Sequence, residues 1–296
     1  MKKFIATQIL GFIIIVFVML TVIFSVTRAI PSDPAALYVS PRMPPEVKEN
    51  LVQRFALDES LETQYIQYLK NFFQGDLGDS FYYGENIWVM LKNGTVPTLI
   101  LLTGALFWAL VLDFISDRKY PQKALINSIA YLIPFLFLGL LLIFVFSFRM
   151  DIVPIGGWMS QSATSGSMGA KVVDVLHHMI LPVMVLIIWL LVAYIPLVKT
   201  VSRGAITEKK TLVPPGLSTV IAGSLLFYSL QIVMTIFSWP GYQGMMLIAS
   251  LNYDYPLAIG ALLVGLLFSF AITLCLEIVY GTLAFISHPS STASPS

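Results

Sequence analysis

Charged residues are scarce in this sequence. Lysine, arginine, aspartate and glutamate make up 11% of its 296 residues, whereas a soluble domain carries about 25%. Hydrophobic residues make up 57%, so the composition excludes an ordinary soluble protein and predicts a membrane protein. The formal net charge is +1, and a balance so close to neutrality gives no reason to expect a nucleic acid or a strongly acidic partner.

Cysteine and histidine are also rare, which limits the available chemistry. The single cysteine, Cys275, cannot form an internal disulfide. His177 and His178 are adjacent, and neighbours on a helix point about 100° apart, so one helix does not aim both at one metal ion. The segment Ser165–Gly169 has serine where a hydrolase elbow has its first glycine, and the sequence contains no glycine-rich nucleotide loop. We expect no catalytic residue, metal or cofactor.

Long apolar runs dominate the chain. Six are long enough to cross the ~30 Å hydrocarbon core of a bilayer, at residues 4–26, 96–115, 124–148, 179–198, 212–236 and 256–286. The sequence therefore predicts an all-α membrane protein with six transmembrane helices. The first run follows Lys2 and Lys3 as a signal peptide would, but no small-x-small cleavage site follows it, so we expect a retained helix.

Changes in polarity divide the chain into four parts. They are a first transmembrane helix at 1–27, an extracytoplasmic insert at 28–94, a five-helix core at 95–289 and a disordered tail at 290–296. Within the insert, apolar residues recur at three- and four-residue steps from Val47 to Phe55 and from Leu61 to Phe72. This spacing predicts two amphipathic helices, so the insert is expected to be small and mostly helical.

Basic residues are unevenly distributed among the loops. The loop 116–123 carries Arg118, Lys119 and Lys123, and the loop 199–211 carries Lys199, Arg203, Lys209 and Lys210. The loop 237–255 carries none, and 149–178 carries only Arg149 and Lys171. Because lysine and arginine concentrate in cytoplasmic loops, we expect a multi-pass protein of the cell (cytoplasmic) membrane with both termini in the cytoplasm. Residues 237–255 would then lie outside.

Two carboxylates, Asp113 and Glu277, fall within apolar runs. An intramembrane carboxylate suggests ion or proton transfer. Both residues lie near the predicted cytoplasmic ends of their runs, however, so a solvated or locally paired side chain is the favoured interpretation. No carboxylate lies at the middle of a run, which argues against a proton-driven carrier.

A set of short motifs carries a family resemblance along nearly the whole chain. The motifs are Arg28–Pro34, Phe55–Asp58, Gly75–Ser80, Val96–Leu99, His178–Pro182, Phe237–Gly241 and Asp254–Pro256. In this order and spacing the chain resembles a membrane-spanning permease of an ABC importer of the dipeptide, oligopeptide and nickel class. It is most similar to the first of the two permease chains of such systems.

The resemblance implies a type I ABC importer permease fold and several partners. These are a second permease chain forming a heterodimer, two cytoplasmic ATPase subunits and an external solute-binding protein. Substrates of the class include short peptides, nickel complexes and oligosaccharides. The outer turn, residues 237–241, would be a gate and docking site through Phe237, Trp239, Pro240 and Gly241, together with Asp254.

Two polar residues of the fifth run, Ser229 and Gln231, are candidates for lining the translocation path. Polar side chains in a bilayer also commonly form hydrogen bonds between helices, which is the alternative interpretation. Both residues lie in the half of the run that is predicted to be closer to the outside.

The cytoplasmic loop departs from the family pattern. Related permeases carry there a coupling helix, with a Glu-Ala-Ala…Gly motif, that docks into the ATPase. Residues 200–211 leave little room for such a helix. Contact with a cytoplasmic partner through Arg203, Glu208, Lys209 and Lys210 is one interpretation, and membrane orientation alone is the other. We expect a permease-like subunit of a peptide or oligosaccharide importer with impaired coupling to ATP. The alternative is a retired permease that serves as a structural subunit of a larger membrane complex.

Overall fold

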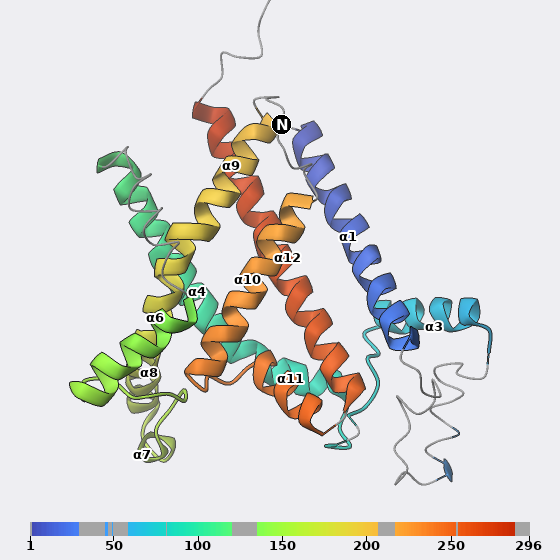
Figure 1. Ribbon diagram of the computed structural model, residues 1–296, viewed down its shortest axis with the longest axis horizontal. Coiled ribbons are helices and arrows are strands. Elements are labelled where there is room, and N and C mark those ends of the chain that lie inside the picture. Colours follow the sequence, from blue (N-terminus) through green and yellow to red (C-terminus); the bar gives the residue numbers. More distant parts are fainter. Residues whose placement is uncertain are drawn as a thin grey trace, which may run out of the picture. The chain divides into compact units, whose positions relative to one another are not determined.

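The structure is a computed structural model. It describes residues 2–29, 45–46, 49, 59–80, 82–119, 135–206, 217–252 and 254–287. Figure 1 shows that these residues are almost entirely helical, and within them the only β pairing is an isolated bridge between Asp79 and Asn86. The prediction of an all-α protein is confirmed.

The helices follow one another along the chain with short connections. They are α1 (Lys2–Ala29), α3 (Leu61–Phe73), α4 (Ile87–Lys119), α6 (Phe135–Leu142), α7 (Gln161–Thr164), α8 (Met168–Trp189), α9 (Ile195–Ile206), α10 (Leu217–Ile236), α11 (Tyr242–Leu251) and α12 (Tyr255–Ser287). Two π-helical segments, η2 (Ile143–Arg149) and η3 (Leu190–Tyr194), continue α6 and join α8 to α9.

The chain forms two compact units. Unit 1 comprises Met1–Ile13, Val96–Pro240 and Leu266–Ser296, and unit 2 comprises Ile14–Thr95 and Gly241–Gly265. In unit 1, α10 packs beside α6 and α8 (Figure 1), and buried residues such as Leu186, Leu226 and Val233 form its core. In unit 2, Ile87, Leu91 and Leu257 belong to a smaller core.

Five helical stretches of the described chain are long and apolar enough to span a membrane. They are Ile5–Val26, Ile87–Ile115, Met168–Ser202, Leu217–Ile236 and Tyr255–Leu283. Each overlaps one of the predicted runs. For the run 124–148, residues 124–134 lie outside the described residues and the rest forms the shorter apolar helix Leu136–Arg149. The sixth transmembrane helix therefore stays a prediction.

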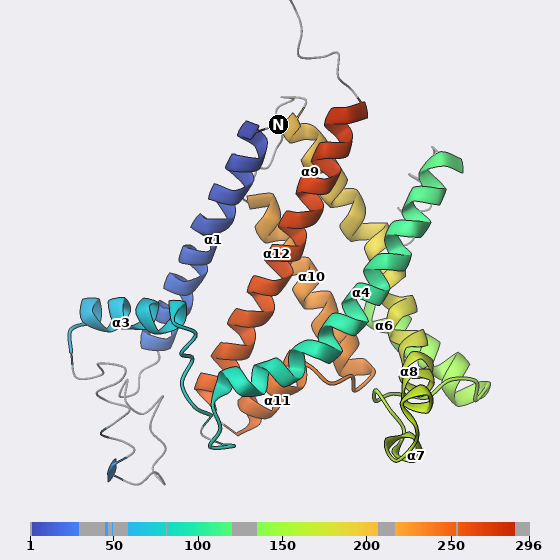
Figure 2. The same ribbon diagram turned by 180° about the vertical axis from the view of Figure 1, so that it is seen from behind.

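The fourth span is longer than the apolar run predicted. The helical path runs from Met168 through η3 to Ile206, beyond both ends of the run 179–198. It starts early because the Ser167 side chain caps α8 by accepting a hydrogen bond from the Ala170 N–H at 3.4 Å. Polar residues therefore extend the helix where hydropathy alone predicts loops. Figure 2 shows the short α7 just before α8.

The insert is described only in part. α3 confirms the second of its two predicted amphipathic helices. Ser60 caps it by accepting a hydrogen bond from the Thr63 N–H, with Glu62 in the first turn and Lys70 in the last, as suits the helix dipole. Most of the segment from Val47 to Phe55 lies outside the described residues. The tail 290–296 also lies outside them.

Candidate functional site

Within unit 1, the outer turn is built around a buried tryptophan. Trp239 has 2% of its side chain exposed and Phe237 has 1%. The Trp239 indole Nε1 donates a hydrogen bond to the backbone carbonyl of Pro97 in α4 at 3.0 Å. A buried indole N–H needs such an acceptor, so this bond fixes the turn that ends α10. The expectation of an interfacial aromatic side chain is wrong for Trp239, because its ring lies inside the protein.

The segment 150–160, here called the strap, crosses the outer turn. The Gly157 N–H donates a hydrogen bond to the Phe237 carbonyl at 2.8 Å. A Cβ atom at Gly156 would lie 2.6 Å from the same carbonyl oxygen, so only glycine allows this approach. The Trp158 ring meets the Trp239 ring edge-on, with 6.5 Å between ring centroids. The strap and the outer turn therefore pack as one assembly.

Three residues of this assembly adopt left-handed backbone conformations. Ser238 has φ 48°, Asp151 has φ 51° and Gly157 has φ 83°. For serine and aspartate this region is sparsely populated and costs free energy. Such conformations persist where the surroundings enforce them, and they are frequent at functional sites and switch regions.

The start of α8 holds both ends of the strap. Asp174 accepts hydrogen bonds from the Ser160 hydroxyl and, at 2.7 Å, from the Ser160 N–H. The His177 Nε2 lies 2.9 Å from the Ile152 carbonyl. The His178 Nδ1 lies 3.4 Å from a carboxylate oxygen of Asp174. The two histidines thus have different partners, and no cluster of three or more metal-ligating side chains occurs in the described residues.

In unit 2, Asp254 joins the end of the insert to the start of α12. Its carboxylate is fully buried and accepts hydrogen bonds from the Ser80 hydroxyl at 2.5 Å and from the Tyr82 N–H at 3.2 Å. It also accepts one from the Leu257 N–H at 3.2 Å, in the first turn of α12. A carboxylate at this position satisfies orphan amide groups and suits the helix dipole. Asp254 therefore positions the chain on both sides of it.

Gly241 and Tyr242 begin α11 in the same unit. Gly241 is buried and precedes the helix directly. The Tyr242 hydroxyl forms a hydrogen bond with the Thr95 hydroxyl at 2.5 Å. Burial raises the pKa of the Tyr242 phenol above its usual range, and the bond to Thr95 opposes that shift. Tyr242 is thus a neutral structural residue at physiological pH.

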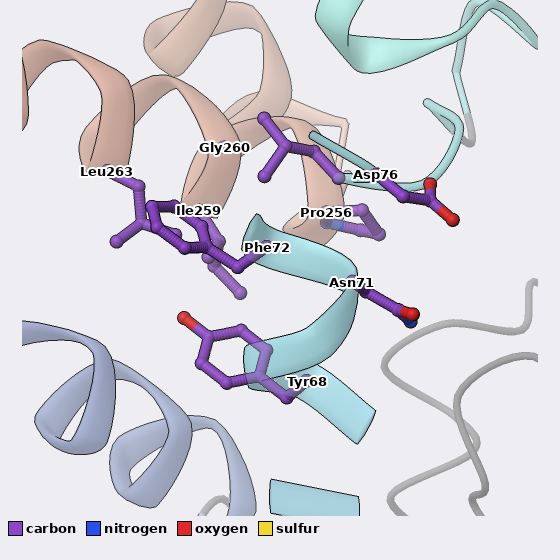
Figure 3. A pocket seen from close by; sticks show the side chains of 9 residues that line it. Tyr68, Asn71, Phe72, Asp76, Pro256, Ile259, Gly260 and Leu263 are labelled. Carbon is purple, nitrogen blue, oxygen red and sulfur yellow. The ribbon is translucent and has the colours of Figure 1, made fainter. Parts of the chain in front are cut away.

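A pocket in unit 2 lies between α3 and the start of α12. Its lining residues are Tyr68, Asn71, Phe72, Asp76, Leu77, Pro256, Ile259, Gly260 and Leu263. Figure 3 shows Phe72, Ile259 and Leu263 gathered on one side, with the polar ends of Asn71 and Asp76 turned to the other. Polar groups do not converge on its interior, as they would in a site for a polar solute. We regard it as a packing crevice.

A buried polar network connects four helical elements of unit 1. Lys199 Nζ lies 2.6 Å from Asp113 Oδ2, and the Tyr280 hydroxyl donates to the same oxygen at 3.3 Å. Glu277, fully buried, accepts hydrogen bonds from Ser218 at 3.2 Å and Thr219 at 2.6 Å. Asp113 is therefore locally paired, as the sequence favoured, and neither carboxylate is solvated.

A second buried contact extends this network along α12. The Tyr194 hydroxyl in η3 lies 2.7 Å from the Thr273 hydroxyl, one turn before Glu277. The hydroxyl partners of α12 were missed from the sequence, because isolated serine, threonine and tyrosine residues in apolar runs carry no signal of their partners. Their role is to join helices by hydrogen bonds in a medium without water.

The remaining candidate residues are not brought together. Ser229 is buried and its hydroxyl donates to the Leu226 carbonyl of its own helix at 2.7 Å. Gln231 is half-buried in the same helix. Arg203 lies within α9, so this part of the predicted loop is helical, whereas Glu208, Lys209 and Lys210 lie outside the described residues. A role in a passage or in partner contact stays a prediction for all of them.

Comparison with known proteins identifies relatives along nearly the whole chain. Residues 1–102 match the family described as binding-protein-dependent transport system membrane component, N-terminal. The glutathione transport system permease protein GsiC of Escherichia coli K12 is 24% identical, over 96% of this chain and 98% of its own. The di/tripeptide transport system permease protein DppB of Pseudomonas aeruginosa is 26% identical, over 95% and 97%.

The alignment with DppB also contains gaps. It extends over 333 positions, more than the 296 residues of this chain. The relative therefore contains residues that have no counterpart here.

Proposed function

Because the chain belongs to the ABC importer permeases of the peptide class, we propose that it is the first permease subunit of a peptide importer in which ATP acts mainly through the second permease chain. As a membrane permease homologue it is not an enzyme. In this proposal its termini face the cytoplasm and its outer turn faces the solute-binding protein. Peptides are preferred over oligosaccharides as substrates because the named relatives carry glutathione and di- or tripeptides.

The packing of the outer turn is the observation that supports this proposal. Trp239 and Phe237 are buried, and hydrogen bonds tie the turn to Pro97 and Gly157. Such a rigid, fully packed turn next to the end of α10 suits a docking and entry surface, because preorganised surfaces lose less entropy on binding. A chain with no remaining outer function would not need glycine at position 156.

The short cytoplasmic connection supports the second part of the proposal. α9 ends at Ile206 and α10 begins at Leu217, so only residues 207–216 join them. A connection of this length can link two neighbouring helices but has little room for a docking helix. A conformational equilibrium shifts only through differential contacts, so ATPase closure would have to act on the other permease chain.

Reconstitution of the complete importer tests the proposal. The chain would be expressed with its second permease chain, the ATPase subunits and the binding protein, purified in nanodiscs and assayed for peptide-stimulated ATP hydrolysis. We expect stimulation by peptide in the complete complex and negligible binding of ATPase to this chain alone. A chimera carrying the corresponding DppB loop in place of residues 199–211 is the matched control and should gain ATPase binding.

The short connection also favours a second candidate function, a structural subunit without transport. That function predicts a native complex that contains this chain and other membrane subunits but no ATPase. Purification of the native complex distinguishes the two. Finding the ATPase subunits together with the second permease chain would contradict the structural role, and their absence would contradict the importer.

A further inference from the structure

The strap is held at its ends and at its middle by contacts of different kinds. At the middle, Gly156 and Gly157 contact the buried outer turn. At the ends, Ser160 is held by Asp174 and Ile152 by His177. The end contacts are polar and partly accessible to water: His177 is exposed and Asp174 is half-buried. Water can replace such hydrogen bonds at a small net free-energy cost, so the end contacts are the ones that can open.

The charges near these end contacts come almost entirely from α8. His178 Nδ1 lies 3.4 Å from Asp174 Oδ2 and 2.8 Å from the Asp174 carbonyl. On the strap side, Arg149 lies over the Phe144 ring, 6.0 Å from its centroid. Within the described residues, neither Arg149 nor the strap residue Asp151 forms an ion pair. Lys171 lies one turn before Asp174 on α8, and residues 237–240 of the outer turn contain no titratable side chain.

Protonation of the two histidines would strengthen both end contacts. A charged His178 attracts the Asp174 carboxylate that holds Ser160. A charged His177 carries a proton on each ring nitrogen and so always donates to the Ile152 carbonyl, whereas neutral histidine does so in only one of its two tautomers. Histidine is the side chain that changes charge between about pH 5 and 8. The end contacts therefore weaken as the external pH rises through this range.

We propose that residues 150–160 are a pH-dependent strap, which protonated His177 and His178 hold closed over the outer turn and which opens when they lose their protons. The left-handed conformations of Asp151 and Ser238 store strain on both sides of the contact, which favours a second arrangement once the ends are free. Opening would free the Phe237 carbonyl and the edge of Trp239. This inference concerns the chain itself and does not depend on the importer function.

Distances between spin labels test the strap directly. Ile155 and Val173 have 62% and 68% of their side chains exposed, so Ile155→Cys and Val173→Cys place labels on the strap and on α8 without removing a buried group. Cys275→Ser removes the native cysteine. Pulsed electron paramagnetic resonance in nanodiscs would compare about pH 5.5 with about pH 8, across the histidine range. We expect one short distance at the lower pH and a longer population that grows about two- to fivefold at the higher pH.

Glutamine variants supply the controls. His177→Gln together with His178→Gln keeps hydrogen-bonding groups that do not titrate, so the distance distribution should no longer depend on pH. The sequence contains three histidines, and His288→Gln, which changes the third, should leave the response intact. Identical distributions at both pH values in the parent chain would overturn the proposal, as would an unchanged response in the double variant. No ATPase or substrate enters the measurement, so its outcome is separate from that of the importer test.

Discussion

The indole Nε1 of Trp239 donates a hydrogen bond of 3.0 Å to the carbonyl of Pro97, a residue 142 positions earlier in the chain. This single bond joins the turn after α10 to the middle of α4. Both residues belong to motifs that the sequence shares with importer permeases. The bond gives a physical reason for the two motifs to occur together, because the tryptophan needs a buried acceptor and the turn needs a fixed anchor.

Loss of this bond should destabilise unit 1 measurably. Trp239→Phe removes the N–H and leaves a small cavity, so we expect a loss of about 1–3 kcal/mol in the free energy of unfolding. Thermal unfolding in nanodiscs measures it. Trp108→Phe is the control: that ring is 53% exposed, and its replacement should change stability by less than about 0.5 kcal/mol. Equal effects of the two substitutions would show that the bond to Pro97 contributes nothing.

The contact between the strap and the outer turn depends on the absence of a side chain at position 156. Gly156→Ala would place a methyl group 2.6 Å from the Phe237 carbonyl oxygen, so the strap must shift. We expect a loss of about 1–3 kcal/mol, with faster hydrogen exchange at the Gly157 amide.

Gly169→Ala is the matched control for this substitution. Gly169 lies in the first turn of α8, and no atom lies within 4 Å of its added methyl group. Since alanine has a higher helix propensity than glycine, stability should be unchanged or should rise by up to about 1 kcal/mol. A loss at Gly169 as large as that at Gly156 would contradict the importance of the close approach.

Asp254 should govern the order of the segment before α4. Asp254→Ala removes the acceptor for Ser80, Tyr82 and Leu257. We expect a loss of at least about 2 kcal/mol, since a hydrogen bond to a charged group contributes roughly 1.5–3 kcal/mol. Hydrogen exchange should accelerate at residues 82–87. Asp254→Asn keeps one side-chain acceptor and should lie between the parent and the alanine variant; an asparagine variant no better than alanine would contradict this ranking.

Sequence reasoning predicted the helices well and the long-range contacts poorly, for physical reasons. Apolar runs must bury or face lipid whatever their partners are, so their length alone identified five spans. The strap could not be predicted in this way. Its contact joins Gly157 to Phe237 through a backbone carbonyl, and a backbone acceptor leaves no mark in the sequence. A glycine pair next to Trp158 was the only available signal.

The outer turn illustrates how a correct motif can be misread. Trp239 was expected at the membrane surface because tryptophan is common there. The structure buries it because a carbonyl of α4 is available to its N–H. By contrast, the loop distribution of lysine and arginine did place Asp113 and Lys199 at the same end of their helices, so their pairing was within reach.

The ion pair between Asp113 and Lys199 should determine whether α9 is fixed. Their side chains are each 12% exposed, and the Lys199 ammonium also lies 5.4 Å from the centre of the Tyr280 ring. The pair thus connects α9 with α4 and α12. Removing one partner leaves a buried unpaired charge, so Asp113→Leu and Lys199→Met should each cost about 3–5 kcal/mol in the free energy of unfolding. The double variant should recover most of that loss, because two apolar side chains then replace two charges.

The double-mutant cycle also tests what the pair does for the helix that leads into residues 207–216. If α9 is locked to its neighbours, labels on α9 should show a narrow distance distribution in the parent and a broad one in either single variant. The double variant would regain stability but not the narrow distribution, because apolar contacts lack the directional geometry of the ion pair. Additive losses in the cycle would mean that the two charges act independently. In that case α9 would be free to move, and the short connection would not by itself prevent this chain from responding to an ATPase.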